Sequence, residues 1–439
     1  MTIESMAGST HAKGGSRRAL VAACAGNAVE WYDLALLGGT ASVIAVVLTP
    51  GGWAGFTTVF AVFATSCLFR PLGSLIIGAR ADRYGRRPML AMTILVMAAA
   101  TFAIGLLPPW SMIGLLAPLG LLALRAVQAF SVGGEIGVSV AYLSELGRGD
   151  RRGEGGGWYL STVAIGLTLG LGLTALLATL LEPAALVSWG WRIPFLLALP
   201  LGIVGVYLRR QLVESSSSAA TLHAAERVHL SVVLRDHLPS IRRCLVIGGA
   251  LSAAFNVWFL FLPSYLAASG AASLGLALGA SLVGLLALAV SAPLFGRLSD
   301  RRGRRPVLVG ATAALAVGIL PLYLWVMTGS TVALLVGNVL IGLVIAAFVV
   351  PSFFAEQFPA RVRATGIGLS YGMSSAVIGG TAPLLATVLS RQAGAVFVAG
   401  YLALWALAAL FAVLRSSETL GRRHGGPDRL GQAGALSGA

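Results

Sequence analysis

The most constraining feature of this sequence is the recurrence of apolar runs along its whole length. Each run of roughly 20 residues is long enough for an α-helix to cross the hydrocarbon core of a bilayer, which is about 30 Å thick. Only 11% of the 439 residues are charged, against about 25% in soluble domains, so the chain lacks the charge to cover a water-facing surface. A transmembrane β-barrel would show alternating segments of about ten residues, and none is present. The sequence therefore predicts an all-α polytopic membrane protein.

The apolar runs predict twelve transmembrane helices in two six-helix bundles. We expect a tail at 1–18, a first bundle at 19–208, a linker at 209–242, a second bundle at 243–414 and a tail at 415–439. The expected spans are 19–48, 54–79, 88–108, 112–144, 157–181, 189–208, 243–268, 273–296, 306–328, 331–354, 365–390 and 393–414.

The distribution of positive charge predicts the orientation. A net charge of +15 could indicate nucleic-acid binding, but most of the 31 Lys and Arg residues lie in the tails and in the loops after even-numbered spans. Arg391 is the clear exception. Short loops rich in Lys and Arg remain in the cytoplasm. We therefore expect a protein of the inner (plasma) membrane with both termini in the cytoplasm, and no nucleic-acid partner.

The two halves carry similar loop sequences. The stretch "ADRYGRRPML" at 81–90 is echoed by "SDRRGRRPVL" at 299–308, and both follow the second span of their half. Parallel six-helix repeats are typical of transporters that bind substrate at the repeat interface near the middle of the membrane.

Ionisable residues inside the apolar spans are the candidates for chemistry, because burying a charge in a bilayer costs at least about 2.5 kcal/mol. Glu30 and Asp33 share one face of span one. Arg125, Gln128 and Glu135 lie on one side of span four, and the distance along the helix axis favours contact of Arg125 with span one.

A carboxylate takes up a proton more readily in a low-dielectric cavity than beside an arginine, so moving between these surroundings would load and release a proton. The hypothesis is that Glu30 or Asp33 carries a coupling proton, with Glu135 as a third candidate. Arg125 would be their gate partner or would anchor a substrate carboxylate. The alternative is a static buried ion pair.

Five stretches together resemble a known family. They are "GNAVEWYD", "RPLGSLIIGARADRYGRRP", "LRAVQAFSVGGEIGVSVAYLSE", "WGWRIPFLLALPLGIVGVYLRRQLVES" and "FAEQFPARVRATGIGLSYGMSSAVIGGTAPLLATVL". The second resembles the cytoplasmic loop signature of the major facilitator superfamily, and the set resembles its metabolite:H⁺ symporters. That family includes permeases for proline/betaine, 2-oxoglutarate, citrate and shikimate. The resemblance covers residues 20 to 415.

The remaining candidate functional residues form two groups, of which the resemblance implies the cytoplasmic gate. Asn27 and Tyr32, with Asn256 and Trp258 of span seven, are the further substrate or gate candidates; for the span-seven residues, aromatic packing is the alternative. The implied cytoplasmic gate comprises Arg70, Gly73, Asp82, Arg83, Gly85, Arg86, Arg87, Glu145, Arg152, Asp300, Arg301, Arg304, Arg305, Glu356 and Arg363. For the arginines, a purely topological role is the alternative. Glu145 and Glu356 would form charge networks with Arg152 and Arg363. The alternative for these two glutamates is that each lies at a solvated helix end without a functional role.

We therefore expect a proton-coupled symporter that imports a small organic acid or zwitterion by alternating access. The alternatives are a proton-coupled exporter of the same fold and a non-transporting membrane sensor. The sequence contains no phosphate-binding loop, metal-ligand cluster or catalytic triad pattern, so no enzyme, metal or cofactor is expected and the energy source is an ion gradient. Na⁺ in place of H⁺ stays open. The expected partners are the substrate, protons and lipid, and we expect a monomer.

Overall fold

The computed structural model describes residues 27–28, 31–84, 86–133, 152–210, 230–359 and 362–420. Within these ranges the regular structure is helical and no strand occurs, which confirms the all-α prediction. After a first helix at Trp31–Val47, the α-helices are α2 (Gly52–Cys67), α3 (Phe69–Tyr84), α4 (Arg86–Gly105), α5 (Trp110–Ile113), α6 (Leu116–Gly133), α8 (Arg152–Leu180), α9 (Pro183–Ala185), α10 (Arg192–Leu196), α11 (Ala198–Arg210), α13 (Leu230–Phe255), α14 (Leu262–Ala268), α15 (Leu274–Arg302), α16 (Arg304–Val326), α17 (Thr331–Ala346), α18 (Val350–Gln357), α19 (Arg363–Met373), α20 (Gly380–Gln392) and α21 (Ala395–Leu414).

The twelve expected spans can be recognised in this helix set. Among the described residues, ten helical stretches are long and apolar enough to cross a membrane, and they coincide in order with all expected spans except the first and third. Those two coincide with the shorter apolar helices Trp31–Val47 and Ala91–Gly105. The chain is therefore a multi-pass α-helical membrane protein.

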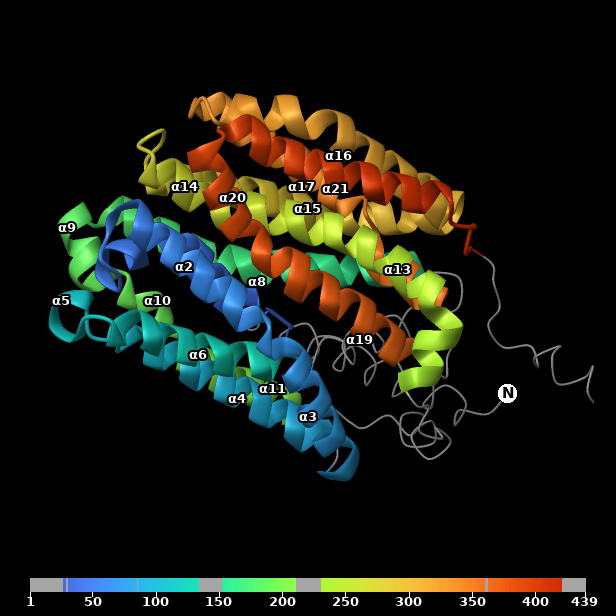
Figure 1. The fold of residues 1–439 in the computed structure, drawn as a ribbon, viewed down its shortest axis with the longest axis horizontal. Helices are drawn as coiled ribbons and strands as arrows, with labels where there is room; N and C mark the ends of the chain where they lie inside the picture. The colour runs from blue at the N-terminus through green and yellow to red at the C-terminus, as the bar shows by residue number, and fades with distance from the viewer. Residues whose placement is uncertain are drawn as a thin grey trace, which may run out of the picture.

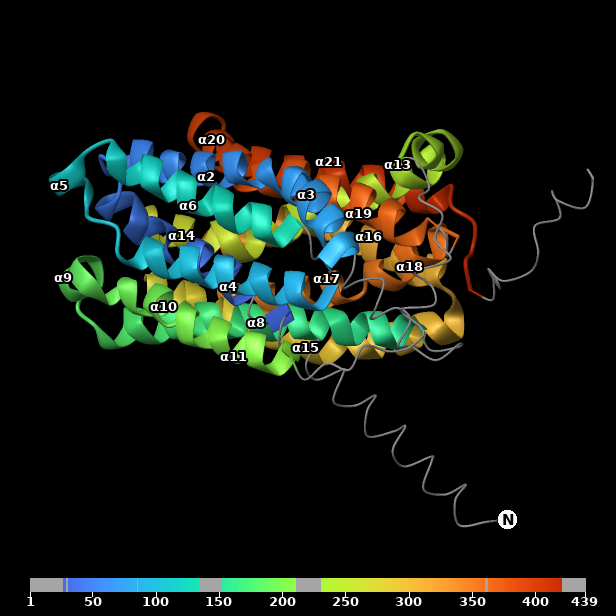
Figure 2. The same cartoon turned by 90° about the horizontal axis from the view of Figure 1, so that it is seen from below.

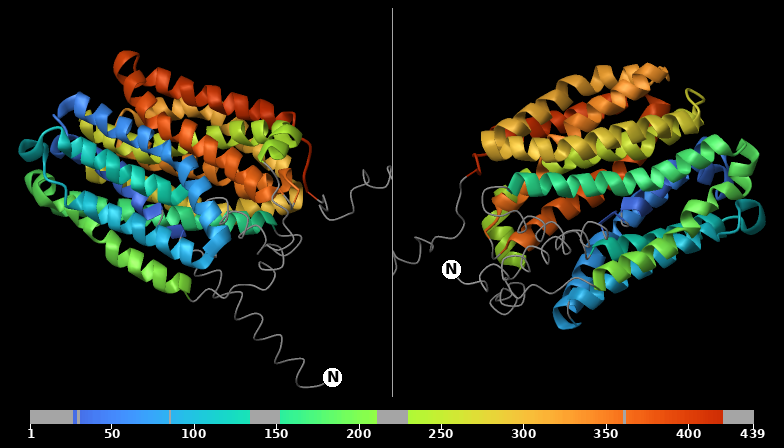
Figure 3. Two further views of the ribbon diagram at one scale, coloured as in Figure 1. Left: turned by 60° about the horizontal axis from the view of Figure 1, so that its bottom comes forward. Right: turned by 180° about the vertical axis from the view of Figure 1, so that it is seen from behind.

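The helices form two groups that pack along a shared interface. Figure 1 shows the first-half helices, blue to green, below most of the second-half helices, yellow to red, and Figure 2 shows the same helices from below. Within the first half, α6 packs against α2, α3 and α4; within the second, α15 packs against α17 and α16 against α21. Between the halves, α8 packs against α15 and α2 against α20. The rear view in Figure 3 shows α8 lying alongside the second half.

The outer surface of the helices is apolar. Side chains such as Val317 on α16 and Leu404 on α21 are 80% and 68% exposed, and similar exposed residues occur on most long helices. Such a surface would drive aggregation in water but matches the hydrocarbon of a bilayer.

The last part of the expected linker at 209–242 is helical. Its first part lies largely outside the described residues, but α13 begins at Leu230 and continues without a break into span seven. Residues 230–242 therefore belong to a long helix, because a polar and basic segment can extend a membrane helix into water without breaking it.

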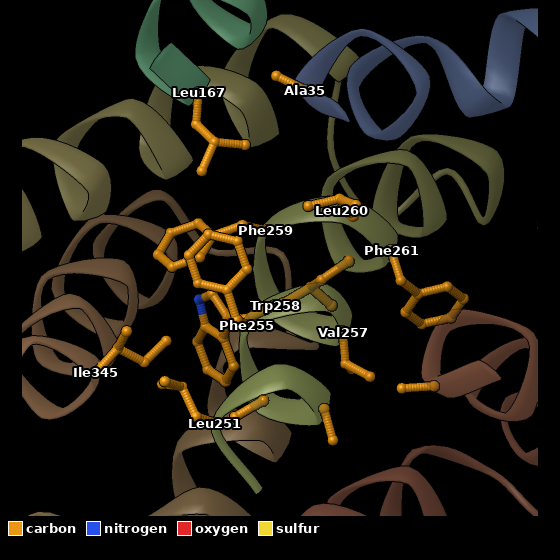
Figure 4. Close-up of a cluster of buried hydrophobic side chains, with 14 of the residues drawn as sticks. Ala35, Leu167, Leu251, Phe255, Val257, Trp258, Phe259, Leu260, Phe261 and Ile345 are labelled. Atoms are coloured by element: carbon orange, nitrogen blue, oxygen red, sulfur yellow. The ribbon is translucent and has the colours of Figure 1, made fainter. Parts of the chain in front are cut away.

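The contact between the halves is built on a π-helical segment, Asn256–Phe261, which connects α13 and α14. All six of its side chains are buried, and Figure 4 shows Ala35 and Leu167 of the first half facing this cluster. The first helix approaches closely at Gly38, where an added Cβ would lie 2.8 Å from Leu260 Cα. A π-helical turn widens the helix locally and is often found at functional sites.

Candidate functional site

A central cavity of about 70 Å³ lies between the two halves. Its walls come from the first helix, α2, α3, α6 and α8 of the first half and from α13, α15, α17 and α19 of the second, with residues of two π-helical segments. A volume of this size holds a few water molecules. Because both halves line the cavity, any movement of one half against the other changes its access.

A buried polar cluster occupies the first-half wall of the cavity. Arg125 Nη1 lies 3.5 Å from Asp33 Oδ2 and donates to Gln128 Oε1 at 2.9 Å. Gln128 Nε2 donates to Asp33 Oδ1 at 2.6 Å, and the Thr101 hydroxyl also donates to Oδ1. The predicted contact of Arg125 with a carboxylate of span one is thus present. A buried carboxylate is tolerated only when donors surround it, and three side chains do so here.

The helix geometry explains why this cluster forms. Arg125 and Gln128 are three residues apart on α6 and so point to one side, while Thr101 comes from α4 on the neighbouring face. The guanidinium carbon Cζ of Arg125 lies over the ring of Phe63 on α2, 5.6 Å from the ring centroid. Arg125 and Asp33 are 5% and 6% exposed, so the pair is shielded from bulk water.

Arg70, which the resemblance assigned to the cytoplasmic gate, lines the cavity. Its Nη1 donates to Ser375 Oγ at 2.8 Å, which links α3 to the π-helical segment Ser374–Gly379 of the second half. The loop signature does not reveal this depth, since Arg70 lies at the start of α3, far from the charged end of that helix.

Aromatic side chains make up much of the remaining wall. Trp31, Phe63 and Tyr159 of the first half and Phe255 and Tyr371 of the second line the cavity. Trp31 meets Phe255 edge-to-face across the interface at 5.8 Å. Such faces attract cationic and apolar groups, so the cavity offers a charged side and an aromatic side.

Three of the other predicted substrate or gate residues lie behind the cavity wall. Asn27 donates to Thr162 at 2.7 Å and accepts from Trp31 Nε1 at 3.2 Å. The Tyr32 hydroxyl donates to the carbonyl of Pro194. Trp258 is fully buried, donates to Asn338 Oδ1 and is not among the residues that line the cavity, which agrees with the aromatic-packing alternative.

Asn256 does line the cavity. Its amide nitrogen donates to the carbonyl of Ser252 at 2.7 Å, one turn earlier on α13. It begins the π-helical segment described above, so a polar side chain stands where the helix widens.

One end of the interface is sealed by aromatic packing. Trp53, Phe56 and Phe60 of α2 contact Phe261 and Tyr265 of the second half, with ring centroids 5.6 to 6.2 Å apart across the interface. Ser264 Oγ of α14 donates to the carbonyl of Gly38 at 2.6 Å near this end. These contacts hold the halves together away from the charged loops.

The opposite end is held by the second copy of the charged loop. Arg304, 1% exposed, donates to Asp300 Oδ1 at 2.6 Å and pairs with Glu356 at 3.0 Å. The two oxygens of Asp300 accept the backbone N–H groups of Gly153 and Glu154 at 2.8 and 2.9 Å. Asp300 therefore caps the N-terminus of α8 in the other half, where a negative charge is stabilised by the helix dipole. Near this cap, exposed Arg297 pairs with Glu154 at 2.8 Å.

The chain after α21 joins this network. Glu418 accepts the backbone N–H groups of Arg304 and Arg305 at 2.9 and 3.1 Å, and so caps α16. Burial raises the pKa of Glu418, but four backbone N–H donors more than offset this, and its pKa lies below the usual range. The Thr419 hydroxyl donates to Glu356. No sequence pattern pointed to these contacts.

The remaining gate candidates are placed as follows. Four candidates lie on α3 and α4, but the structure does not describe their side chains: Asp82, Arg83, Arg86 and Arg87. Four further candidates lie outside the described residues: Glu30, Gly85, Glu135 and Glu145. Arg152 and Arg363 begin α8 and α19, Arg301 is exposed at the end of α15, and Arg305 donates to the carbonyl of Leu414. Gly73 packs so closely on α6 that a Cβ would lie 1.8 Å from the Phe130 carbonyl.

A metal site was not expected from the sequence. Among the described residues, no group of three His, Cys, Asp or Glu side chains is positioned to hold a metal ion. The polar side chains of the described cavity wall carry carboxylate, guanidinium, amide, hydroxyl and thiol groups.

Comparison with known proteins agrees with this architecture. The sequence matches the family model of the Major Facilitator Superfamily over residues 23–355 and 270–435. It is 32% identical over 421 residues to the glycine betaine/proline/ectoine/pipecolic acid transporter OusA of Dickeya dadantii, covering 92% of this chain and 83% of that protein. It is 33% identical over 385 residues to the alpha-ketoglutarate permease of Escherichia coli, covering 84% and 87%.

Among solved structures, the fold is similar to the xylose transporter XylE of E. coli in a partially occluded, inward-open conformation. The TM-score is 0.72, with 19% sequence identity and coverage of 93% of this chain and 100% of that one. The similarity to this structure concerns the fold alone.

Proposed function

Because this chain belongs to the Major Facilitator Superfamily, and is thus a membrane transporter rather than an enzyme, we propose that it imports a small carboxylated or zwitterionic metabolite together with a proton. The relatives named above are transporters of betaine and proline and a permease of alpha-ketoglutarate. All of these solutes are small and carry a carboxylate. The proposal takes this shared chemistry, and no single relative's substrate, as the class.

The observation that carries the proposal is the Asp33–Arg125–Gln128 cluster in the wall of the cavity. A cavity shared by two halves supplies the substrate site of an alternating-access transporter. A buried carboxylate beside an arginine supplies a group whose proton affinity changes when the arginine moves or is engaged by a substrate. Asp33 is therefore the proposed proton carrier and Arg125 the proposed anchor for a substrate carboxylate.

In the proposed cycle, binding and protonation depend on one another. When a substrate carboxylate takes up donors of Arg125, Asp33 loses part of its compensation and binds a proton. With Asp33 protonated and the substrate carboxylate bound to Arg125, the cluster is neutral and the Asp33–Arg125 ion pair is no longer needed. The two halves can then rock about the cavity. Release of the substrate on the other side returns Arg125 to Asp33, which expels the proton.

We place the protein in the inner membrane with both termini in the cytoplasm, on the basis of the Lys and Arg distribution. In this orientation the Asp300–α8 contact and the Glu418 cap lie on the cytoplasmic side. The aromatic seal around Phe261 lies on the outer side. The proposed energy source is the proton gradient, without a cofactor.

The experiment is uptake into proteoliposomes with an imposed inward proton gradient. We would screen labelled proline, glycine betaine, 2-oxoglutarate and shikimate, each with and without protonophore. Accumulation of one compound that collapses with protonophore supports the proposal. Accumulation that requires Na⁺ and does not depend on the proton gradient would show that Na⁺, and not H⁺, is the coupling ion. Loss of a preloaded compound without any uptake would indicate export.

Two variants connect this assay to the cluster. Asp33→Asn and Arg125→Ala should each abolish accumulation while the protein remains in the membrane. Arg391→Lys, an exposed position at the end of α20, serves as the matched control. Normal uphill uptake in either cluster variant would remove that residue from the mechanism.

A further inference from the structure

Two guanidinium groups line the cavity, and each has one hydrogen-bonding edge without a partner among the described residues. Arg70 uses Nη1 for Ser375, and Arg125 uses Nη1 for Asp33 and Gln128. The Nε–H groups of Arg70 and Arg125 are both buried and have no acceptor. In a guanidinium, the Nε and Nη2 donors lie parallel and form the fork that binds a carboxylate bidentately. The free edge is therefore of the kind that binds a carboxylate.

The charges of the described cavity wall leave a cationic excess. Arg70 and Arg125 are its two cations and Asp33 is its one carboxylate. Asp33 already accepts from Thr101, Gln128 and Arg125. Arg70 is close enough to repel the charge of Arg125. Two like charges in a shielded cavity are stabilised by an anion that both can bind, and a substrate carboxylate is such an anion.

The position of Arg70 is fixed from both sides. On the first-half side, an added Cβ on Gly133 would lie 1.9 Å from the Arg70 carbonyl, so α3 and α6 are in contact at this level. On the second-half side, Ser375 holds Nη1 at 2.8 Å. A side chain held at its backbone and at one tip presents its remaining edge in a defined direction, which lowers the entropy cost of binding a ligand.

We propose that Arg70 is a second carboxylate-binding residue of the transport cavity and holds the substrate carboxylate jointly with Arg125. This rests on the proposed function and goes beyond it, because it assigns a ligand contact to a residue that the loop signature places in the gate. Arg70 belongs to α3 and its partner Ser375 to the second half, so a carboxylate bound to Arg70 joins the two halves through one side chain. Substrate binding at Arg70 would therefore affect the contact between the two halves.

The test compares acids with their amides on purified full-length protein. Binding of proline and prolinamide, glycine betaine and its amide, and 2-oxoglutarate and its monoamide is titrated by tryptophan fluorescence, since Trp31 lines the cavity. Wild type should bind at least one acid about 10-fold or more tightly than its amide. Arg70→Lys keeps the charge but loses the fork, and should reduce this ratio by about 10-fold.

Two controls separate ligand contact from other roles. Ser375→Ala removes the contact that orients Arg70 but leaves its fork, so it should lower the ratio less than Arg70→Lys does. Arg391→Lys, at an exposed position outside the cavity lining, should keep the ratio. The ratio of two dissociation constants does not depend on the folded fraction. If Arg70→Lys yields no folded protein, phenylglyoxal modification of wild type decides, because the acid should protect Arg70 and the amide should not.

The outcomes distinguish the two proposals. The Arg70 contact alone is overturned if wild type binds an acid but Arg70→Lys leaves the acid-to-amide binding ratio unchanged. It is equally overturned if the acid does not protect Arg70 of wild type from phenylglyoxal. A slower uptake at an unchanged ratio assigns Arg70 to gating and equally overturns it. Failure of wild type to bind any of the six compounds overturns the proposed function and this inference with it.

Discussion

The energetic link between Asp33 and Arg125 can be predicted from their separation. At 3.5 Å, two unit charges in an effective dielectric constant of about 20 attract by about 5 kcal/mol. Desolvation of both ions offsets much of this, so removing one partner of a buried pair costs about 3–5 kcal/mol while removing both costs far less. We expect Arg125→Gln and Asp33→Asn each to destabilise the protein by about 3 kcal/mol. The double variant should be less destabilised than their sum by about 2–3 kcal/mol.

The assay is SDS-induced unfolding in mixed micelles, followed by circular dichroism, for wild type, both single variants and the double variant. The exposed pair Arg297–Glu154 provides the control cycle and should show little coupling, because Arg297 is exposed to solvent. The Asp33–Arg125 coupling requires an ionised Asp33, so it should be present above the pKa of Asp33 and disappear as the pH falls through it. Additive losses at every pH would refute the ion pair and, with it, the electrostatic basis of the proposed proton step.

Three further predictions concern the helix contacts and the charged end of the interface. Gly73→Ala should prevent folding, since the new Cβ would overlap the Phe130 carbonyl, whereas Gly368→Ala, with open space around it, should not; size-exclusion profiles of the membrane extract would show this. Asp300→Asn should weaken the cap of α8 by about 1–2 kcal/mol and slow uptake without changing substrate affinity, measured as initial rates against substrate binding. Glu418→Gln should cost about 1 kcal/mol of stability at neutral pH. Because the folded-state pKa of Glu418 is depressed, its contribution is lost as the pH falls through that pKa, and thermal melts of variant and wild type should converge in acid.

The helical architecture follows from local properties of the sequence. Apolar length predicts a membrane helix because every backbone polar group must be satisfied within the segment. The contact of Arg125 with a carboxylate of span one could also be predicted from the sequence. A charge in an apolar span is costly and needs a partner, and Arg125 was the nearest candidate on another span. Thr101 carries the same kind of signal, as a polar residue within an apolar run, but a single hydroxyl is common in membrane helices and does not stand out.

Other features depend on tertiary contacts that no local pattern records. The depth of Arg70 is set by the close crossing of α3 and α6 at Gly73 and Gly133. Trp258 is buried against Asn338 within a π-helical segment, and a π-helical turn is not recognisable from a regular helical repeat in the sequence. Glu418 lies in a polar tail, and only the fold brings it to the start of α16.

The central claim is that substrate and proton cross together through the cluster at Asp33. The most direct measurement is proton movement driven by substrate, read from a pH-sensitive dye trapped in proteoliposomes that have no initial pH gradient. Addition of the transported compound outside should acidify the lumen with wild type. With Asp33→Asn the lumen should not acidify, although exchange of labelled for unlabelled compound continues. Equal acidification with Asp33→Asn would contradict the account and place the coupling proton on another group.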